Sequence, residues 1–247
     1  MALTEKPVPY GARFFKRHIM SYLFDPAPVI ALPIVGDDRS FPVRRVFCVG
    51  RNYEAHAAEL GNKIDRDDPF YFTKSPLHIV VGDGEAALAA GTDDYHHEIE
   101  FVVALSADMN NATPEQAMEA VFGYGVGQDM TRRDLQNKAK DKRRPWDTAK
   151  DVEQSAILSA ITPKAAFGDI GDQMITLTVN GKMQQEGKLS DMVWSVPEIL
   201  SHLSTLYTLR AGDIIMTGTP SGVGPVAKGD VLVSRVDGCE PLTTTIV

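Results

Sequence analysis

Cysteine and long apolar runs are both scarce in this sequence. Cys48 and Cys239 are the only two cysteines among 247 residues, and they lie too far apart for a metal-binding motif. A chain so poor in cysteine builds no disulfide framework, so we expect it in the reducing cytoplasm. No apolar run approaches the roughly 18 residues of a membrane span. The N-terminus also lacks the apolar core of a signal peptide, so we expect no membrane partner.

Positive charge is scarce as well. The chain has 25 lysines and arginines against 33 aspartates and glutamates, which gives a net charge of −8. Nucleic acid is therefore not expected as a partner, because phosphate binding needs a basic surface. One basic cluster, residues 138–144, interrupts the acidity. It has the pattern of a solvated helix end followed by a loop.

The length and the turn pattern predict an α+β domain with an appendage. A chain of 247 residues can bury a full core. Residues 1–40 are rich in proline and predict an extension packed on a main domain of residues 41–247. Strand patterns outnumber helical ones and are joined by tight turns, which favours a fold dominated by sheet. Strands are predicted at residues 45–49, 70–72, 79–81, 97–105, 175–179, 213–216 and 231–233, and helices at 53–60, from 113, from 131 and at 195–206.

Local signals mark the ends of several elements. Thr113 and Ser195 each stand shortly before a proline and three residues ahead of Gln or Glu, which is the pattern of a capping box. Asn180-Gly181 follows an alternating strand and predicts a tight hairpin turn.

Glu98 and Glu100 provide the strongest functional clue. They lie two residues apart on a predicted strand, so both carboxylates project from the same face. Like charges held together in a half-buried place repel each other and lose hydration. A hard divalent cation such as Mg²⁺ or Mn²⁺ relieves both problems. Asp129, where a strand leads into a helix, supplies a third carboxylate, so the three predict a metal site. The alternative for Glu98 and Glu100 is an ordinary solvent-facing side of a strand.

His56 and Glu59 are three residues apart, which places them on one face of a predicted helix. A carboxylate beside an imidazole raises its basicity and fixes its tautomer, so the pair can act as a general base for water. An exposed helix surface is the alternative, and Lys150 taken alone has the character of a surface lysine.

His96 and His97 are possible zinc ligands, but neighbours on a strand point to opposite faces, so ordinary strand residues are favoured.

Several short motifs follow one another along the chain. They are Gly50–Glu59, Glu98-Ile99-Glu100, Asp129–Gln136, Pro145–Lys150, Asn180-Gly181 and Thr217–Gly224. Each motif alone is common, but the ordered set resembles the fumarylacetoacetate hydrolase family over about residues 41–247. The stretch 41–53 is most similar to the members of that family that cleave fumarylpyruvate.

This resemblance implies a fold, an assembly and a set of site residues. The fold would be a roll of mixed β-sheets, usually assembled as a homodimer. Glu98, Glu100 and Asp129 would hold one Mg²⁺ or Mn²⁺ per chain. The segment bearing His56 and Glu59 would act as a lid over the substrate. The remaining matches are Lys150 as the active-site lysine, Arg133 and Gln136 as pocket residues, Thr219 as the receiver of the substrate's carboxylate end, and Arg51 as a contact for a second carboxylate.

The sequence therefore predicts a metal-dependent hydrolase that cleaves a carbon–carbon bond in an acylpyruvate. Fumarylpyruvate, from the breakdown of aromatic compounds, is the leading 2-oxo acid substrate. The first alternative keeps the metal site but decarboxylates or isomerises an oxo-acid such as oxaloacetate, a reaction that needs no attacking water. The second alternative is a catalytically silent relative that serves as a binding protein. The presence of three acids, the His56–Glu59 pair and Lys150 argues against the second.

Overall fold

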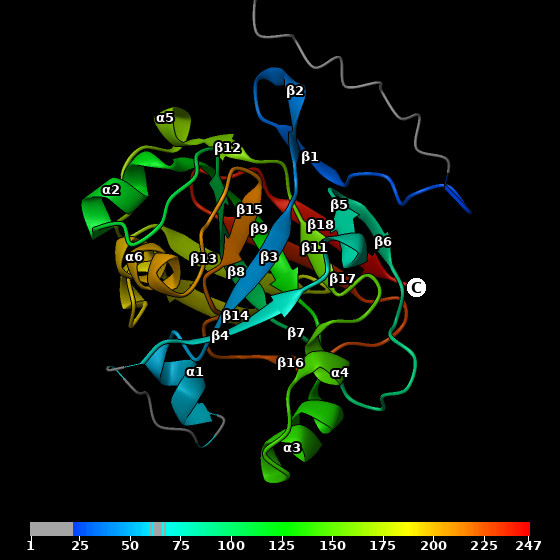
Figure 1. Cartoon of the computed structure of the whole chain (residues 1–247). Coiled ribbons are helices and arrows are strands. Elements are labelled where there is room, and N and C mark those ends of the chain that lie inside the picture. The colour runs from blue at the N-terminus through cyan, green and yellow to red at the C-terminus, as the bar shows by residue number, and fades with distance from the viewer. Residues whose placement is uncertain (1–21, 60, 62–65, 67) are drawn as a thin grey trace, which may run out of the picture.

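The computed structural model describes residues 22–59, 61, 66 and 68–247, and a mixed eight-stranded sheet is its largest element (Figure 1). β3 and β15 are parallel neighbours in this sheet, as are β11 and β5, while the remaining neighbours are antiparallel. The strands in spatial order are β4 (Phe70–Lys74), β3 (Arg45–Gly50), β15 (Asp213–Met216), β8 (Ile99–Leu105), β9 (Val121–Asp129), β11 (Ala156–Leu158) and β5 (Ile79–Val81), and β12 (Thr162–Pro163) also pairs with β9.

A second sheet of five strands packs against the first. Its order is β14 (Lys182–Lys188), β13 (Met174–Val179), β17 (Val231–Val236), β18 (Leu242–Ile246) and β6 (Gly84–Ala86). Two smaller sheets complete the strands: β10 (Thr131–Arg132), β7 (Tyr95–His97) and β16 (Gly224–Pro225) form one, and β1 (Ala31–Ile34) and β2 (Asp37–Pro42) form the other.

The helices are short and lie around the sheets (Figure 1). The longest, α6, has 11 residues. In the part of the chain that the structure describes, no helix is long and apolar enough to cross a membrane. The helices are α1 (Glu54–Glu59), α2 (Pro114–Glu119), α3 (Arg133–Asp141), α4 (Asp147–Lys150), α5 (Lys164–Phe167) and α6 (Val196–Leu206), with 3₁₀ turns η1 (Pro76–His78) and η2 (Leu189–Asp191). The predicted α+β fold, dominated by mixed sheet, is confirmed.

Most of the helix starts and turns that local sequence signals predicted are found in the structure. Thr113 caps α2 with a complete capping box, and Ser195 is the N-cap of α6, where its N–H donates to Glu198 Oε2 at 2.8 Å. Asn180 and Gly181 join β13 to β14 with φ angles of 52° and 77°, as a hairpin turn with both central residues left-handed requires. The helix predicted from Thr131 begins later, at Arg133, because Thr131 and Arg132 instead pair with β7 as the short strand β10.

The two faces of β8 belong to two different hydrophobic clusters. Phe101 and Val103 join the larger cluster, which contains side chains of both large sheets and of α6. Val102 and Ala104 join a smaller cluster on the opposite face. Glu100 shares the face of Val102 and Ala104 because alternate residues of a strand point the same way. The fold therefore turns Glu100 away from the five-stranded sheet.

The N-terminal part is described from residue 22 onward, so most of the predicted extension of residues 1–40 lies outside the described residues. Its described end forms the β1–β2 hairpin, and Leu32 and Phe41 are buried in the smaller cluster. The proposed boundary after residue 40 falls inside β2 (Asp37–Pro42), and the division into extension and main domain stays a prediction.

Candidate active site and metal centre

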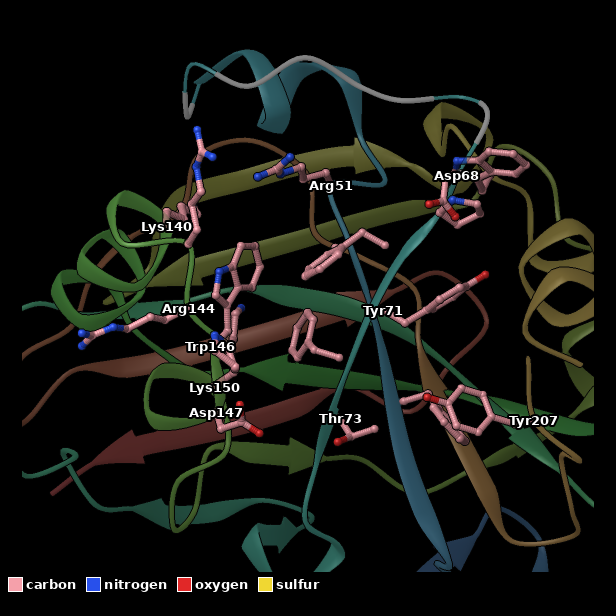
Figure 2. A pocket seen from close by; sticks show the side chains of 18 residues that line it. Arg51, Asp68, Tyr71, Thr73, Lys140, Arg144, Trp146, Asp147, Lys150 and Tyr207 are labelled. Carbon is pink, nitrogen blue, oxygen red and sulfur yellow. The ribbon is translucent and has the colours of Figure 1, made fainter. Parts of the chain in front are cut away.

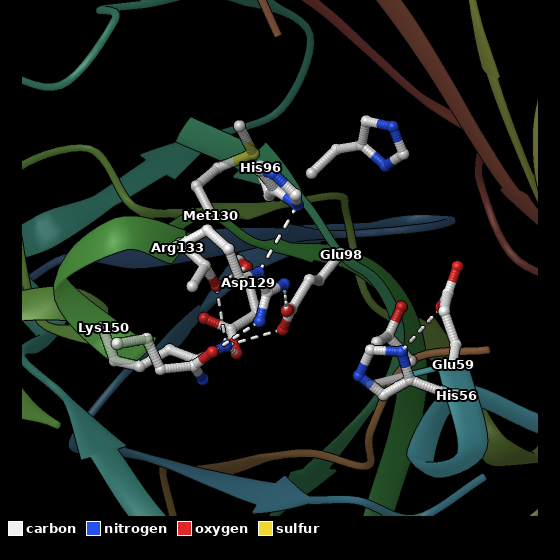
Figure 3. A network of polar contacts seen from close by, with 12 residues as sticks. His56, Glu59, His96, Glu98, Asp129, Met130, Arg133 and Lys150 are labelled. Carbon is white, nitrogen blue, oxygen red and sulfur yellow. Dashed lines mark hydrogen bonds and ion pairs between the residues drawn. The ribbon is translucent and has the colours of Figure 1, made fainter. Parts of the chain in front are cut away.

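Three buried carboxylates converge at one point. Figure 3 shows two of them, Glu98 and Asp129, within a network of polar contacts. One oxygen from each of Glu98, Glu100 and Asp129 lies within 4.8 Å of the others. The three residues expose only 4%, 2% and 0% of their surface, so the solvent-facing alternative for Glu98 and Glu100 is wrong.

The backbone brings these acids together at adjacent strand ends. Asp129 is the last residue of β9, and its N–H donates to the carbonyl of Glu98 at 2.8 Å. The strand predicted to run unbroken from residue 97 is interrupted at Glu98, which separates β7 from β8. There the N–H of Glu98 donates to the side-chain oxygen of Gln128 at 3.2 Å. The interruption places Glu98 beside Asp129, while Glu100 remains in the hydrogen-bonded pairing of β8 with β9.

Three buried cations surround the acids, and each comes from a different element. Lys150, at the end of α4, donates from Nζ to Glu98 Oε2 and Asp129 Oδ2, both at 2.6 Å. The Nζ of Lys74, at the end of β4, lies 2.8 Å from Asp129 Oδ1. Arg133, at the start of α3, donates from Nη2 to Glu98 Oε1. Glu98 and Asp129 are therefore charge-compensated within the protein.

Glu100 has no such cation. The N–H of Gly218 donates to its Oε2 at 2.7 Å, and no lysine or arginine of the described residues lies within 4.0 Å of it. Burial and the neighbouring Asp129 carboxylate raise the pKa of Glu100 well above its ordinary value. Burial would also raise the pKa of Glu98, but Lys150 and Arg133 outweigh it and hold that pKa below its ordinary value.

The donor set fits a hard divalent cation. Carboxylate oxygens are the ligands that Mg²⁺ and Mn²⁺ prefer. Glu100 lacks a cationic partner, and Asp129 Oδ1 receives no hydrogen bond despite its proximity to Lys74. A divalent ion would supply the positive charge that Glu100 lacks and would give Asp129 Oδ1 a bonding partner.

Lys74 is a central residue that the sequence did not reveal. It is 2% exposed, and its Nζ donates to the carbonyls of Met130 and Lys150 and, at 2.9 Å, to Ser155 Oγ. It therefore fixes the backbone that carries Lys150 as well as facing Asp129. The only sequence signal was a lysine ending an apolar strand pattern.

Thr219 lies on the loop that follows β15 and lines the same cavity as the acids. Gln185 of β14 donates from Nε2 to Thr219 Oγ1 at 2.7 Å and accepts from the N–H of Ile99 at 3.1 Å. Because the amide nitrogen is only a donor, Thr219 Oγ1 accepts there and keeps its own hydrogen for another partner. Gln185, which sequence reasoning also missed, thus ties the loop to the acid-bearing strand.

Gly218, beside Thr219, has a φ of 99°, and a Cβ there would lie 2.7 Å from that of Asn52. A glycine is therefore required where the backbone approaches Glu100.

His56 and Glu59 form the predicted pair on α1. The Nδ1 of His56 lies 3.3 Å from Glu59 Oε2, and the other Glu59 oxygen accepts from the N–H of Gly222 at 3.1 Å. His56 is 5% exposed. Burial lowers the pKa of His56 below its ordinary value of 6.5, and the opposing effects of Glu98 and Glu59 are smaller. Burial therefore favours the neutral imidazole, and the contact of Nδ1 with Glu59 leaves Nε2 to accept a proton.

The remaining predicted residues meet in the same place. Arg133 and Gln136 are both buried on α3, with 2.5 Å between Nη1 of the arginine and Oε1 of the glutamine. Every predicted site residue except Glu59, which contacts His56, lines one cavity: Arg51, His56, Glu98, Glu100, Asp129, Arg133, Gln136, Lys150 and Thr219.

His96 and His97 have separate partners. His96 contacts Asp94 and Arg133, whereas Nδ1 of His97 lies 2.9 Å from the side-chain oxygen of Gln185. Both histidines therefore have partners of their own, and neither belongs to the carboxylate cluster.

Comparison with known proteins gives a consistent result over most of the chain. The family model described as fumarylacetoacetate (FAA) hydrolase C-terminal matches residues 45–247. A fumarylpyruvate hydrolase of a Ralstonia species is 42% identical over 190 residues, which cover 76% of this chain and 98% of the relative. An oxaloacetate tautomerase of Escherichia coli is 38% identical over 208 residues, covering 84% of this chain and 94% of the relative.

Among solved structures, fumarylpyruvate hydrolase from Pseudomonas aeruginosa, in complex with Mn²⁺ and pyruvate, superimposes with a TM-score of 0.88. It is 40% identical, and the match covers 92% of this chain and 99% of that one.

The metal site predicts a ligand-dependent melting temperature. Mn²⁺ at 100 times its dissociation constant adds about 2.7 kcal/mol to the unfolding free energy, which raises the melting temperature by roughly 5–10 °C. Glu100→Gln keeps the side chain's shape and removes its charge, so this rise should vanish in thermal unfolding. Glu115→Gln, on an exposed position, serves as the control and should retain it. A full rise in the Glu100→Gln variant would contradict the ligand assignment.

The buried contacts of Lys74 predict that its replacement strongly lowers the free energy of unfolding, although Lys74 does not line the cavity of the acids. Lys74→Met removes one of the two cations that face Asp129 and the donor to two backbone carbonyls and to Ser155 Oγ. Breaking one partner of a buried pair costs about 3–5 kcal/mol of unfolding free energy, to be measured by urea denaturation. Lys182→Met, on an exposed position of β14, should change it by less than about 0.5 kcal/mol. Equal stabilities of the two variants would rule out this role.

Proposed function

The chain belongs to the fumarylacetoacetate hydrolase family, and we propose that it is a metal-dependent hydrolase that cleaves a carbon–carbon bond of an acylpyruvate. Fumarylpyruvate is the leading substrate, giving fumarate and pyruvate. The observation that carries this proposal is the meeting of three buried carboxylates, a buried lysine and His56, which contacts Glu59, in one cavity. Two related fumarylpyruvate hydrolases, one of them bound to Mn²⁺ and pyruvate, support it.

Glu98, Glu100 and Asp129 would hold one Mg²⁺ or Mn²⁺. When bound, the ion supplies Lewis-acid stabilisation of the negative charge that develops on the 2-oxo acid part of the substrate. Thr219 is placed to donate its free hydroxyl hydrogen to the substrate's carboxylate, because Gln185 already occupies an acceptor position of its oxygen.

His56 would activate the attacking water. Its Nδ1–H donates to Glu59, so Nε2 accepts the proton as the water oxygen bonds to the carbonyl carbon remote from the carboxylate. Lys150, whose pKa burial would lower but Asp129 and Glu98 raise above its ordinary value, stays charged and would stabilise the resulting oxyanion. The carbon–carbon bond then breaks, and its electron pair leaves with the three-carbon fragment. Protonation of that fragment gives pyruvate.

An oxaloacetate decarboxylase or tautomerase is the second candidate. The similarity to an oxaloacetate tautomerase favours it. The His56–Glu59 pair favours hydrolysis, because decarboxylation needs no base to activate water. A catalytically silent binding protein is the weakest alternative, since the three acids, His56 and Lys150 all line the cavity. We further propose that the protein is a cytoplasmic homodimer that acts on small 2-oxo acids. We also propose that it binds no nucleic acid, because its net charge of −8 disfavours phosphate binding.

The activity is tested by following the ultraviolet absorbance of fumarylpyruvate. With Mg²⁺ or Mn²⁺ the absorbance should fall, and fumarate and pyruvate should form in equal amounts, whereas EDTA should abolish both. Loss of oxaloacetate without cleavage of fumarylpyruvate, under the same conditions, would replace the hydrolase by the second candidate.

The role of His56 predicts both a rate and a pH effect. His56→Ala should lower kcat by about 10²–10⁴-fold, the usual contribution of a general base, while the Mn²⁺-induced rise in melting temperature persists. In the unmodified enzyme the rate falls as His56 becomes protonated. Because burial lowers its pKa, this fall should begin below pH 6.5 in the kcat/KM profile. Unchanged turnover of His56→Ala would exclude the dyad as the base.

A further inference from the structure

His96 and His97 of β7 stand directly before Glu98, and each side chain contacts a residue that supports the site. Because neighbouring residues of a strand point to opposite faces, the two imidazoles reach different elements. His96 contacts Arg133 at the start of α3, whereas His97 contacts Gln185 in β14. The two adjacent histidines therefore connect the segment before Glu98 to two elements that are far apart in the sequence.

The contacts of His96 determine which of its nitrogens carries the hydrogen. Its Nδ1 accepts from Nε of Arg133 at 3.4 Å (Figure 3), because an arginine nitrogen can only donate. Its Nε2 lies 2.8 Å from Asp94 Oδ1, so this nitrogen carries the hydrogen and donates it to the carboxylate. The backbone N–H of Arg133 donates to the carbonyl of the same Asp94 at 2.7 Å. Asp94, His96 and Arg133 thus form a closed set of hydrogen bonds.

His96 completes the acceptors around the Arg133 guanidinium. Nη1 of Arg133 contacts Gln136 Oε1, and Nη2 contacts Glu98 Oε1. With Nε bound to His96, each of the three guanidinium nitrogens has an acceptor, so the group cannot turn without breaking a hydrogen bond. Arg133 is 4% exposed and lines the cavity of the acids. His96 therefore fixes the orientation of a charged group at the wall of that cavity.

The amide of Gln185 places the hydrogen of His97 on the other kind of nitrogen. Gln185 Nε2 donates to the carbonyl of Pro220 at 2.8 Å, and its Oε1 accepts from the N–H of Ile99 at 3.1 Å. These two backbone groups exclude the flipped amide. Since Nδ1 of His97 lies 2.9 Å from the same Oε1, this nitrogen must donate.

Gln185 connects His97 to Thr219. Its Nε2 also donates to Thr219 Oγ1 at 2.7 Å, so the amide that His97 holds in turn holds a hydroxyl at the wall of the cavity. His97 is 1% exposed and Gln185 is fully buried. Loss of the imidazole therefore removes one of the two hydrogen bonds that orient the amide oxygen, in a place where water does not readily replace it.

We propose that His96 and His97 are positioning residues for substrate binding. His96 orients Arg133, and His97, through Gln185, orients Thr219. The inference rests on the proposed function, in which Thr219 binds the substrate's carboxylate and Arg133 lines the pocket. It assigns neither metal binding nor proton transfer to the two histidines. The two roles require opposite tautomers, with the hydrogen on Nε2 of His96 and on Nδ1 of His97.

The tautomers are measured directly by long-range proton–nitrogen correlation spectra of the histidine side chains in the Mg²⁺-loaded protein. His96→Asn and His97→Asn identify the two signals, because each variant lacks one of them. The spectra should show hydrogen on Nε2 of His96 and on Nδ1 of His97. The same tautomer at both residues, or the reverse assignment, would overturn the inference without any reference to activity.

Pyruvate binding to the Mn²⁺-loaded protein, measured by calorimetry, tests the consequence for the site. His96→Leu and His97→Leu should each weaken binding by about tenfold, the effect of one lost hydrogen bond in a buried network. His96→Asn offers an amide oxygen, and His97→Asn an amide nitrogen, near the position of Nδ1. Each asparagine variant should therefore bind pyruvate within about threefold of the unmodified protein. All four should keep the Mn²⁺-induced rise in melting temperature.

Rescue by asparagine separates positioning from folding, because a structural defect depends on the loss of the ring and not on the donor or acceptor. Equal pyruvate affinity of the leucine variants and the unmodified protein, or equal weakening by leucine and asparagine, would contradict the inference. Loss of the Mn²⁺ response in the leucine variants would contradict it as well.

Cleavage of fumarylpyruvate distinguishes this inference from the proposed function. The leucine variants should raise KM by about tenfold and lower kcat by less than about threefold, as expected when binding groups are displaced. A fall in kcat with KM unchanged would contradict a positioning role in binding. If the unmodified protein cleaves no fumarylpyruvate, while the tautomers and the pyruvate affinities are as predicted, the hydrolase function fails and the positioning roles stand.

Discussion

The burial of three carboxylates at one point is the constraint on which the rest of this structure depends. Carboxylates withdrawn from water must be protonated, paired or bound to a metal ion. Lys74, Lys150 and Arg133 compensate Glu98 and Asp129 from three separate elements, so β4, α4 and α3 must all reach the point where β8 begins and β9 ends. Glu100 is left with a single backbone N–H, and burial beside Asp129 raises the pKa of its carboxyl. We propose that a divalent cation supplies the charge that Glu100 lacks.

Charged residues divide the active site into two zones, an inner one lined by acids and an outer one lined by basic residues. The inner zone is rich in buried acids and requires positive charge, whereas the basic residues Arg51, Lys140, Arg143 and Arg144 line an adjoining outer cavity of about 700 Å³ (Figure 2). Lys150 and Arg51 line both zones. We propose that one substrate molecule spans both zones with its 2-oxo acid at the carboxylates, and fixing such a geometry is itself a large part of catalysis.

Local patterns in the sequence predicted local structure well, and long-range contacts less so. Asn180-Gly181 and the capping residues Thr113 and Ser195 specify their turns and helix starts through neighbours in the sequence. The alternation of Glu98 and Glu100 predicted their convergence, even though the strand is interrupted between β7 and β8. Lys74 and Gln185 were missed because their partners, Asp129 and Thr219, come from distant segments that only the folded sheets bring together. Thr131 was assigned to a helix because its pairing with β7 is likewise non-local.

The central claim is that Glu98, Glu100 and Asp129 bind one divalent ion. Anomalous diffraction from crystals grown with Mn²⁺ tests it directly, because the signal locates the metal independently of any assumption about the fold. The account predicts one peak per chain, in contact with an oxygen of each of the three carboxylates. A peak elsewhere, or none at saturating Mn²⁺, would mean that the surrounding cations alone compensate these acids, and the proposed metal chemistry would have to be abandoned.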